Sequence, residues 1–190
     1  SGVRAFEKAI GGCMRKVAAG KAEGKITDKQ VIRSANVEEF LGKPRFTDDP
    51  LMKRGRPGVM MGLAWTPLGG TALYVEAQAA PGKTSTTLTG QLGEVMREST
   101  QIAYSLVTAN CARLGIDETF FEDRIIHIHV PAGATPKDGP SAGITMATAL
   151  VSLGRNERPP ARWAMTGELT LTGRVLPVGV IKEKVIAAKR

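Results

Sequence analysis

Residues 124–143 join three kinds of local structure in immediate succession, and this order limits the folds open to the chain. Residues 124–130 are rich in β-branched side chains and predict a short strand, which a loop with several glycines and prolines follows. Residues 141–153 are mostly apolar and predict a helix. Ser141 then lies on the first turn of that helix, beside backbone N–H groups that no helical carbonyl can reach. A serine in this place suits a catalytic nucleophile, and it also suits a simple helix cap.

The rest of the chain mixes strand and helix periodicities without a strict alternation. Strands are predicted at residues 58–66, 71–79, 85–89 and 163–166, with a hairpin over residues 169–178 around Thr172 and Gly173. Helices are predicted at residues 91–114 and 180–190, and Gly115 is expected to end the first of them. This mixture indicates the α+β class.

The N-terminal part has the pattern of the end of a separate domain. Residues 3–19 carry apolar side chains at helical spacing, but a lone helix cannot bury such a stripe by itself. A short helix is expected after Asn36, with Glu39 in the capping-box position. The expected organisation is therefore a terminal segment, a linker and a main domain, at residues 1–45, 46–57 and 58–190.

The charge of the chain raises the hypothesis of nucleic-acid binding. The formal net charge is +8 and the pI is near 9.8, which would suit a basic nucleic-acid-binding module. The basic residues are spread along the sequence and mixed with acidic ones, and one small cluster, Lys53, Arg54 and Arg56, lies in an expected loop. Nucleic-acid binding is therefore the alternative hypothesis rather than the first one.

Other features of the sequence bear on the compartment of the protein and on whether it binds a metal. No apolar run approaches the roughly 18 residues of a membrane span, and the charged N-terminal residues do not resemble a secretory signal. Cys13 and Cys111 have no CxxC partner, so we expect buried thiols in a reducing, cytoplasmic compartment. His127 and His129 share one side of their strand, and without nearby cysteines they are expected to form hydrogen bonds rather than bind a metal.

Two common kinds of chemistry fit Ser141 poorly. Residues 139–143 match the pattern G-x-S-x-G, but an α/β-hydrolase needs a histidine after the serine, and both histidines of this chain precede it. A phosphate loop needs a lysine immediately before the serine, where this chain has Pro140. Neither a hydrolase of that type nor nucleotide binding is therefore expected here.

A serine activated by a lysine fits better. Burial lowers the pKa of a lysine by up to about 3–5 units, which leaves a sheltered amine neutral enough to take the serine proton. Lys182 and Lys184 are the candidates on the last helix. Lys184 is expected to share a side with Val180 and Ile181, whereas Lys182 points elsewhere and is expected to be solvated.

Three motifs together resemble the proteolytic domain of the Lon protease family. They are P-K-D-G-P-S-A-G at residues 136–143, M-T-G-E at 165–168 and K-E-K at 182–184. The resemblance covers roughly residues 58–190 and implies a Lon-type α+β fold. It implies that Ser141 is the nucleophile and Lys184 the general base of an ATP-dependent serine endopeptidase. Unfolded or damaged proteins would be the substrates, and a homohexameric ring the assembly.

The same resemblance implies roles for neighbouring residues. Thr166 is expected either to hold the Lys184 amine or merely to end a strand. Asp138 would orient the loop, influence the charge of the dyad or serve as a turn residue, and His129 would support the site. Where the family usually has two adjacent glycines before the lysine helix, this chain has Gly179 and Val180.

The resemblance extends to the two ends of the chain. Residues up to about 45 resemble the end of an AAA+ ATPase helical subdomain, in which Arg4 would face the nucleotide. ATP and magnesium would belong to that missing ATPase domain, and no cofactor is expected in this part of the chain, which has no Walker motif. The proteolytic domain is expected to be truncated at Arg190, short of the strands and helix that usually complete it.

Overall fold

The structure is a computed structural model that describes residues 2–43, 55–67, 69–160 and 162–189. The chain divides into two compact units, Ser1–Pro50 and Leu51–Arg190. Most of the linker expected at residues 46–57 lies outside the described residues, as do Lys53 and Arg54 of the basic cluster. The domain boundaries expected from the sequence therefore remain predictions.

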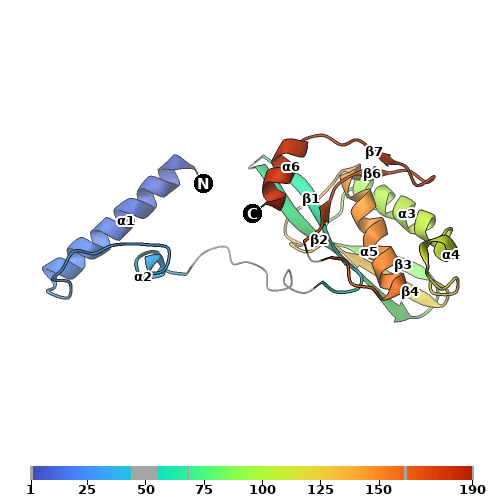
Figure 1. Ribbon diagram of the computed structural model, residues 1–190, viewed down its shortest axis with the longest axis horizontal. Helices are drawn as coiled ribbons and strands as arrows, with labels where there is room; N and C mark the ends of the chain where they lie inside the picture. Colours follow the sequence, from blue (N-terminus) through green and yellow to red (C-terminus); the bar gives the residue numbers. More distant parts are fainter. Residues whose placement is uncertain (1, 44–54, 68, 161, 190) are drawn as a thin grey trace. The chain divides into compact units, whose positions relative to one another are not determined.

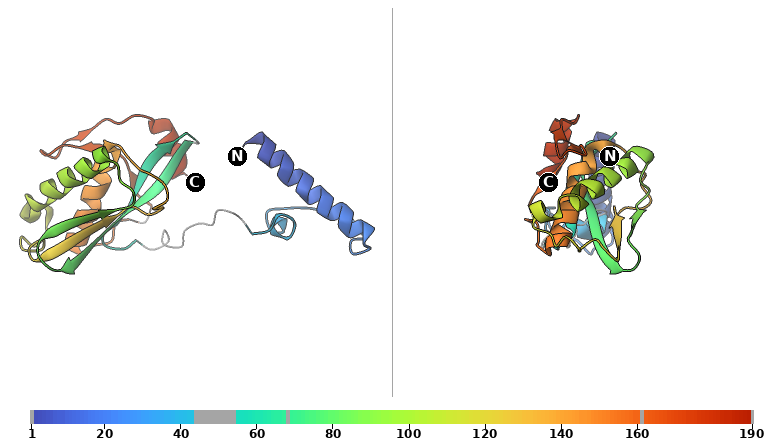
Figure 2. Two further views of the ribbon diagram at one scale, coloured as in Figure 1. Left: turned by 180° about the vertical axis from the view of Figure 1, so that it is seen from behind. Right: turned by 90° about the vertical axis from the view of Figure 1, so that its right-hand side faces the viewer.

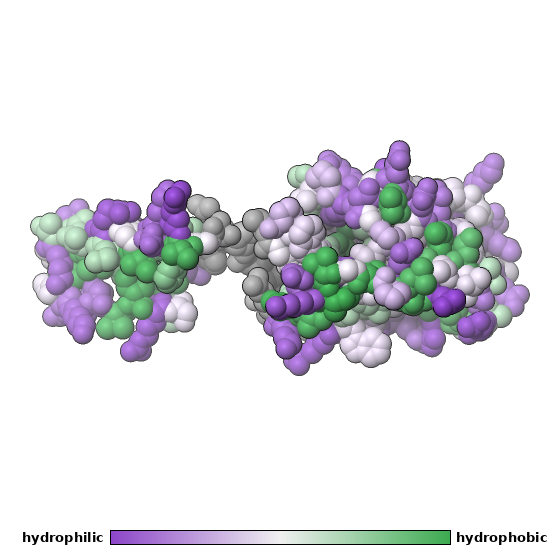
Figure 3. All heavy atoms as spheres, turned by 90° about the horizontal axis from the view of Figure 1, so that it is seen from above, coloured by the Kyte–Doolittle hydropathy of each residue, from purple (hydrophilic) through white to green (hydrophobic). Residues whose placement is uncertain are grey.

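The N-terminal unit contains a long helix and a short one, α1 (Val3–Ala22) and α2 (Val37–Leu41) (Figure 1). The helix predicted at residues 3–19 is confirmed and extends to Ala22. Of the described residues of α1 only Cys13 is buried, while Val3, Phe6 and Met14 are exposed. Apolar atoms accordingly lie on the surface of this unit in Figure 3.

The capping box predicted for Asn36 and Glu39 is wrong. The side chain of Asn36 accepts a hydrogen bond from the backbone N–H of Arg33 at 2.7 Å and donates one to the carbonyl of Val31 at 3.1 Å. Both partners lie before the helix, so the asparagine closes the preceding turn and is not free to cap α2.

A five-stranded mixed sheet is the centre of the described part of the larger unit. Its strands are β1 (Val59–Thr66), β2 (Gly69–Pro81), β3 (Ser85–Thr89), β4 (Arg124–His129) and β5 (Ala164–Met165). Their order is β3-β4-β2-β1-β5, with antiparallel pairing of β2 to β1 and β4, and parallel pairing of β3 to β4 and of β5 to β1. The predicted strands and the α+β class are confirmed.

Two helices, α3 (Glu94–Thr108) and α5 (Gly143–Arg155), cover one face of this sheet (Figures 1 and 2). Alternation along the strands turns apolar side chains toward them, including Met60, Val75 and Ile128, which are almost completely buried. The helices contribute Met146 and Leu150 to the same core. The apolar helix predicted from Ser141 onward is thus confirmed as a core element.

The single helix predicted at residues 91–114 is wrong, because the structure has α3 and a separate short helix, α4 (Cys111–Leu114). Asn110 lies between them with φ −126° and ψ 22°, outside helical geometry. Its side-chain amide donates to the carbonyl of Leu106 at 2.8 Å, and the hydroxyl of Thr108 donates to that of Tyr104 at 2.9 Å. Such side-chain bonds to the backbone compete with the helical ones.

The C-terminal part contains the predicted hairpin, β6 (Glu168–Leu169) with β7 (Val175–Leu176), and the predicted helix, α6 (Ile181–Ala188). The large apolar side chains of α6 are exposed. Of its described residues only Lys184 is buried, whereas Ile181 and Ile186 are exposed, as is Val180 before the helix. The reason lies in β2, where Gly70 touches the α6 backbone at Glu183 and Lys184, so that this part of α6 faces the sheet.

Candidate active site

Ser141 lies in a 3-10 turn, η2 (Pro140–Ala142), which leads into α5. The sequence predicted the first turn of the α-helix itself, and the difference comes from the residues before the serine. Gly139 has φ 111°, a conformation that favours glycine, and Pro140 starts the turn with a preset φ. The N–H of Gly143 then bonds to the carbonyl of Pro140, and Ser141 is left half-buried at the mouth of the helix.

Lys184 is the buried lysine of this region, with 4% of its surface exposed. Its Nζ donates a hydrogen bond to Thr166 Oγ1 at 3.0 Å. Burial lowers the pKa of Lys184, because the charged amine loses hydration that a single hydroxyl only partly replaces. The amine of Lys184 is therefore sheltered from solvent, whereas Lys182 is solvent-exposed as expected.

Thr166 connects the lysine to the serine segment. Its hydroxyl accepts from Lys184 and donates to the backbone carbonyl of Ser141 at 3.3 Å. The next residue, Gly167, donates its N–H to the same carbonyl at 2.8 Å and accepts from the N–H of Ile144 at 3.2 Å. The segment after β5 therefore holds both ends of the turn that carries Ser141. Of the two roles expected for Thr166, the structure shows the contact with the Lys184 amine.

The two side chains of the expected dyad do not bond to each other directly. Among the described residues, the hydrogen bond of the Lys184 amine runs to Thr166, and no bond joins Lys184 Nζ to Ser141 Oγ. Catalytic hydrogen bonds are often loose before a substrate binds, so this geometry is compatible with proton transfer in a complex. The structure thus brings Ser141, Thr166 and Lys184 to one place.

Asp138 anchors the loop before Ser141 to helix α3. Its Oδ1 accepts from the backbone N–H of Met96 at 2.9 Å and from that of Gly139 at 2.8 Å. Met96 lies in the first turn of α3, whose own N-cap residue provides no side-chain cap, so Asp138 caps the helix from a distant part of the chain. This position matches the loop-orienting role among the three expected for Asp138. Ser99 adds a further link by donating to the carbonyl of Pro140 at 3.3 Å.

Lys137 is a structural residue that sequence reasoning missed. Its Nζ donates to the carbonyls of Gly90, Ala132 and Thr135 at 2.9, 2.9 and 3.0 Å, which closes the loop that precedes the serine. Burial lowers the pKa of this lysine also. The sequence shows Lys137 inside the motif at residues 136–143, but it does not show its partners. The carbonyl of Gly90 comes from a remote segment that no local pattern indicates.

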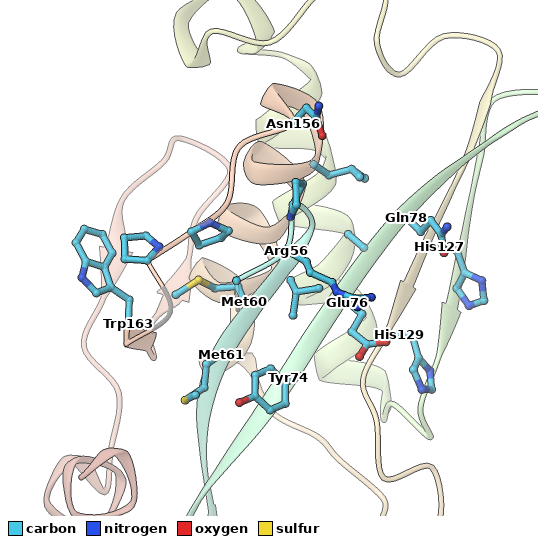
Figure 4. A pocket seen from close by; sticks show the side chains of 17 residues that line it. Arg56, Met60, Met61, Tyr74, Glu76, Gln78, His127, His129, Asn156 and Trp163 are labelled. Atoms are coloured by element: carbon cyan, nitrogen blue, oxygen red, sulfur yellow. The ribbon is translucent and has the colours of Figure 1, made fainter. Parts of the chain in front are cut away.

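His129 lies away from this arrangement. His129 Nδ1 and His127 Nε2 both share hydrogen bonds with Thr89 Oγ1, at 2.7 and 2.9 Å. The expected hydrogen-bonding role is present, but these bonds link β4 to β3 rather than to Ser141 or Lys184. Figure 4 shows both rings beside a cavity of about 830 Å³ that includes Glu76 and Trp163. Neither Ser141 nor Lys184 lines this cavity, so it is separate from the expected dyad.

Two kinds of feature are absent from the described residues. No group of three or more histidine, cysteine, aspartate or glutamate side chains is placed to hold a metal ion there. Nor does the described part contain a helix with the length and apolar character needed to cross a membrane. Cys13 and Cys111 are free, buried thiols, as predicted.

The fold and the cluster around Ser141 agree with comparisons to known proteins. A family model described as the Lon protease (S16) C-terminal proteolytic domain matches residues 31–190. The chain therefore belongs to the Lon protease family, as the motifs indicated, and its described fold agrees with that family's proteolytic domain.

Similar full-length proteins support the same assignment. The chain is 55% identical over 192 residues to the Lon protease of Koribacter versatilis and 52% identical over 193 residues to that of Chloroflexus aurantiacus. It is 54% identical over 190 residues to the Lon protease of Methylocella silvestris. Each match covers 100% of this chain but only 23–24% of the relative. The chain thus spans about a quarter of the length of these relatives.

Proposed function

We propose that this chain carries the peptide-cleaving site of a serine endopeptidase, with Ser141 as nucleophile and Lys184 as general base. The burial of the Lys184 amine is the observation that supports this most strongly, because burial lowers its pKa toward the range in which a neutral amine can accept a proton. The link through Thr166 supports the pairing.

The proposed reaction has two stages. Neutral Lys184 takes the proton from Ser141 Oγ as the oxygen attacks the peptide carbonyl carbon, and backbone N–H groups near Ser141 stabilise the oxyanion. The carbon–nitrogen bond then breaks, and the lysine returns the proton to the leaving amine. Water then attacks the resulting ester while Lys184 takes its proton and passes that proton to the Ser141 oxygen. This step releases the second product and regenerates the serine hydroxyl.

The activity of the whole protein is also a proposal, since this chain corresponds to a quarter of its relatives. We propose ATP-dependent degradation of unfolded or damaged proteins in the cytoplasm, by a homohexamer whose ring encloses the proteolytic sites. ATP and magnesium would bind the AAA+ domain, of which residues 1–45 would form the end.

Cleavage of a fluorogenic peptide tests the dyad. We expect Ser141→Ala and Lys184→Ala each to abolish cleavage while the circular dichroism spectrum stays native. Ser105→Ala on the exposed side of α3 and Lys182→Ala on α6 are the matched controls, and both should retain activity. Unchanged cleavage in either dyad variant would reject the proposal.

The nucleic-acid alternative rests on the net charge alone. It predicts binding that weakens steeply with added salt and that Ser141→Ala does not affect. No described feature of the fold favours it over the peptidase, so it is not developed into a second proposal.

A further inference from the structure

A second cavity, of about 430 Å³, lies between helices α3, α4 and α5 and the hairpin of β6 and β7. Its size is within the range of about 300–1,000 Å³ that ligand sites occupy. Neither Ser141 nor Lys184 lines it. Its lining is described throughout, so no part of this cavity depends on segments outside the described residues.

The walls of the cavity are mainly apolar. Eight of the residues that line it are apolar and come from α3, α4, α5 and the hairpin, among them Leu106, Leu114, Ile144, Val151 and Leu169. Leu171 of the hairpin continues the wall and is 63% exposed. Binding of an apolar ligand in a concave site is favourable because it removes such apolar surface from water.

Two polar groups lie at the α4 side of the cavity. Arg113 lines it and forms no ion pair or hydrogen bond with any described residue. Asn110 donates its amide to the carbonyl of Leu106, which leaves its side-chain oxygen available as an acceptor. The cavity therefore combines an apolar wall, an unpaired cation and a free acceptor.

We propose that this cavity binds the carboxyl-terminal end of a polypeptide whose last residues are apolar. The terminal carboxylate would bond to the guanidinium of Arg113, an arrangement for which arginine is well shaped. The last amide N–H would donate to Asn110, and the apolar side chains would lie on the wall. A fatty acid would satisfy the cation and the wall but has no donor for Asn110, so the observations favour a peptide.

The cavity shares elements with the proposed active site without sharing its reactive groups. Ile144 lines it and bonds through its N–H to Gly167, which also holds the Ser141 carbonyl. Leu169 lines it and packs closely on Gly143. Binding in the cavity does not require the dyad to be correct, so it can be measured in a chain that lacks the nucleophile.

Fluorescence anisotropy on the Ser141→Ala chain tests the proposal. The probe is a fluorescein-labelled peptide of alternating glycine and serine that ends in two leucines, made with a free carboxylate and with an amide. We expect the amide to bind at least about tenfold more weakly, because a hydrogen bond to a charged group is lost. Arg113→Gln should weaken the carboxylate peptide to the level of the amide and leave the amide unchanged.

Matched variants separate this reading from a general effect of charge. Arg174→Gln removes the same charge from an exposed position on the hairpin that does not line the cavity, and it should change nothing. Leu171→Asp alters the exposed part of the wall and should weaken both peptides. Melting temperatures near that of the parent chain would show that each variant is folded.

Three results would overturn the proposal. The first is equal affinity for the carboxylate and the amide. The second is tight binding of dodecanoate, blocked by Arg113→Gln, with no binding of either peptide. The third is a concentration-dependent dimer in sedimentation that Arg113→Gln dissolves, because a second copy of the chain would then be the occupant.

Discussion

Replacement of Gly70 by alanine probes how the fold places Lys184. Gly70 lies in β2 against the backbone of α6, and a Cβ there would lie 2.5 Å from the carbonyl carbon of Glu183 and 3.0 Å from the backbone nitrogen of Lys184. The carbonyl oxygen of Glu183 would be closer still. Backbone atoms cannot rotate away as a flexible side chain can, so the helix itself must move.

The size of that movement follows from the contact distances. Ordinary contact begins at 3.4 Å, so the Glu183 carbon must move away by at least about 0.9 Å, and its closer carbonyl oxygen by more. Lys184 is the next residue and would move with it. A displacement of about 1 Å in a catalytic group costs on the order of 100-fold in rate, and overpacking costs about 1–3 kcal/mol in stability. We therefore expect kcat for a fluorogenic peptide to fall about 100-fold.

Gly179→Ala is the matched control, because a Cβ at that glycine would meet no atom within 4 Å. It also precedes α6, and it should leave kcat close to that of the parent chain. Urea denaturation would measure the stability of both variants. The reasoning is refuted if Gly70→Ala folds and cleaves at the parent rate, since the position of Lys184 would then not limit the reaction.

Two further predictions concern charged groups of the site. Burial lowers the pKa of Lys184 from its ordinary value of 10.5. The buried charged amine therefore destabilises the folded chain to its full extent below the lowered pKa, and this destabilisation disappears as pH rises through 10.5. In urea denaturation, Lys184→Met should therefore stabilise the chain at neutral pH, and the gain in stability should shrink toward pH 10.5. The control, Lys182→Met at an exposed position, should show no such trend. A stability difference for Lys184→Met that does not change with pH would contradict this prediction. Asp138→Ala should lower the stability of the chain by about 0.5–2 kcal/mol, because α3 loses its cap. Asp138→Asn keeps an acceptor oxygen and should lower the stability less. Equal losses of stability in the two variants would argue against capping.

Much of the fold was accessible from local patterns. The β-branched side chains of residues 124–130 predicted β4, and the run at residues 58–66 predicted β1; Met60 and Ile128 of these strands lie in the core. The apolar run after Ser141 predicted α5. The motifs that carry Ser141 and Lys184 indicated the family, and the family model confirmed it.

The helix errors show where local pattern fails. Asn110 is compatible with a helix by sequence, yet its side chain bonds to the Leu106 carbonyl and divides α3 from α4. In α6 the apolar spacing of Ile181, Val185 and Ile186 predicted a helix, but it did not show which of its side chains are buried. Contact with Gly70 of β2 presents Lys184 to the sheet, because a bare backbone allows the helix to approach closely there.

Local patterns along the chain thus predicted the strands and most of the helices, and together with the family resemblance they singled out Ser141 and Lys184. They could not establish the environment of those two side chains. The bridge from Lys184 through Thr166 to the Ser141 carbonyl, and the cap that Asp138 provides to α3, join residues from separate elements. Such contacts form when distant segments pack together, and the burial that lowers the pKa of Lys184 exists only in the folded chain.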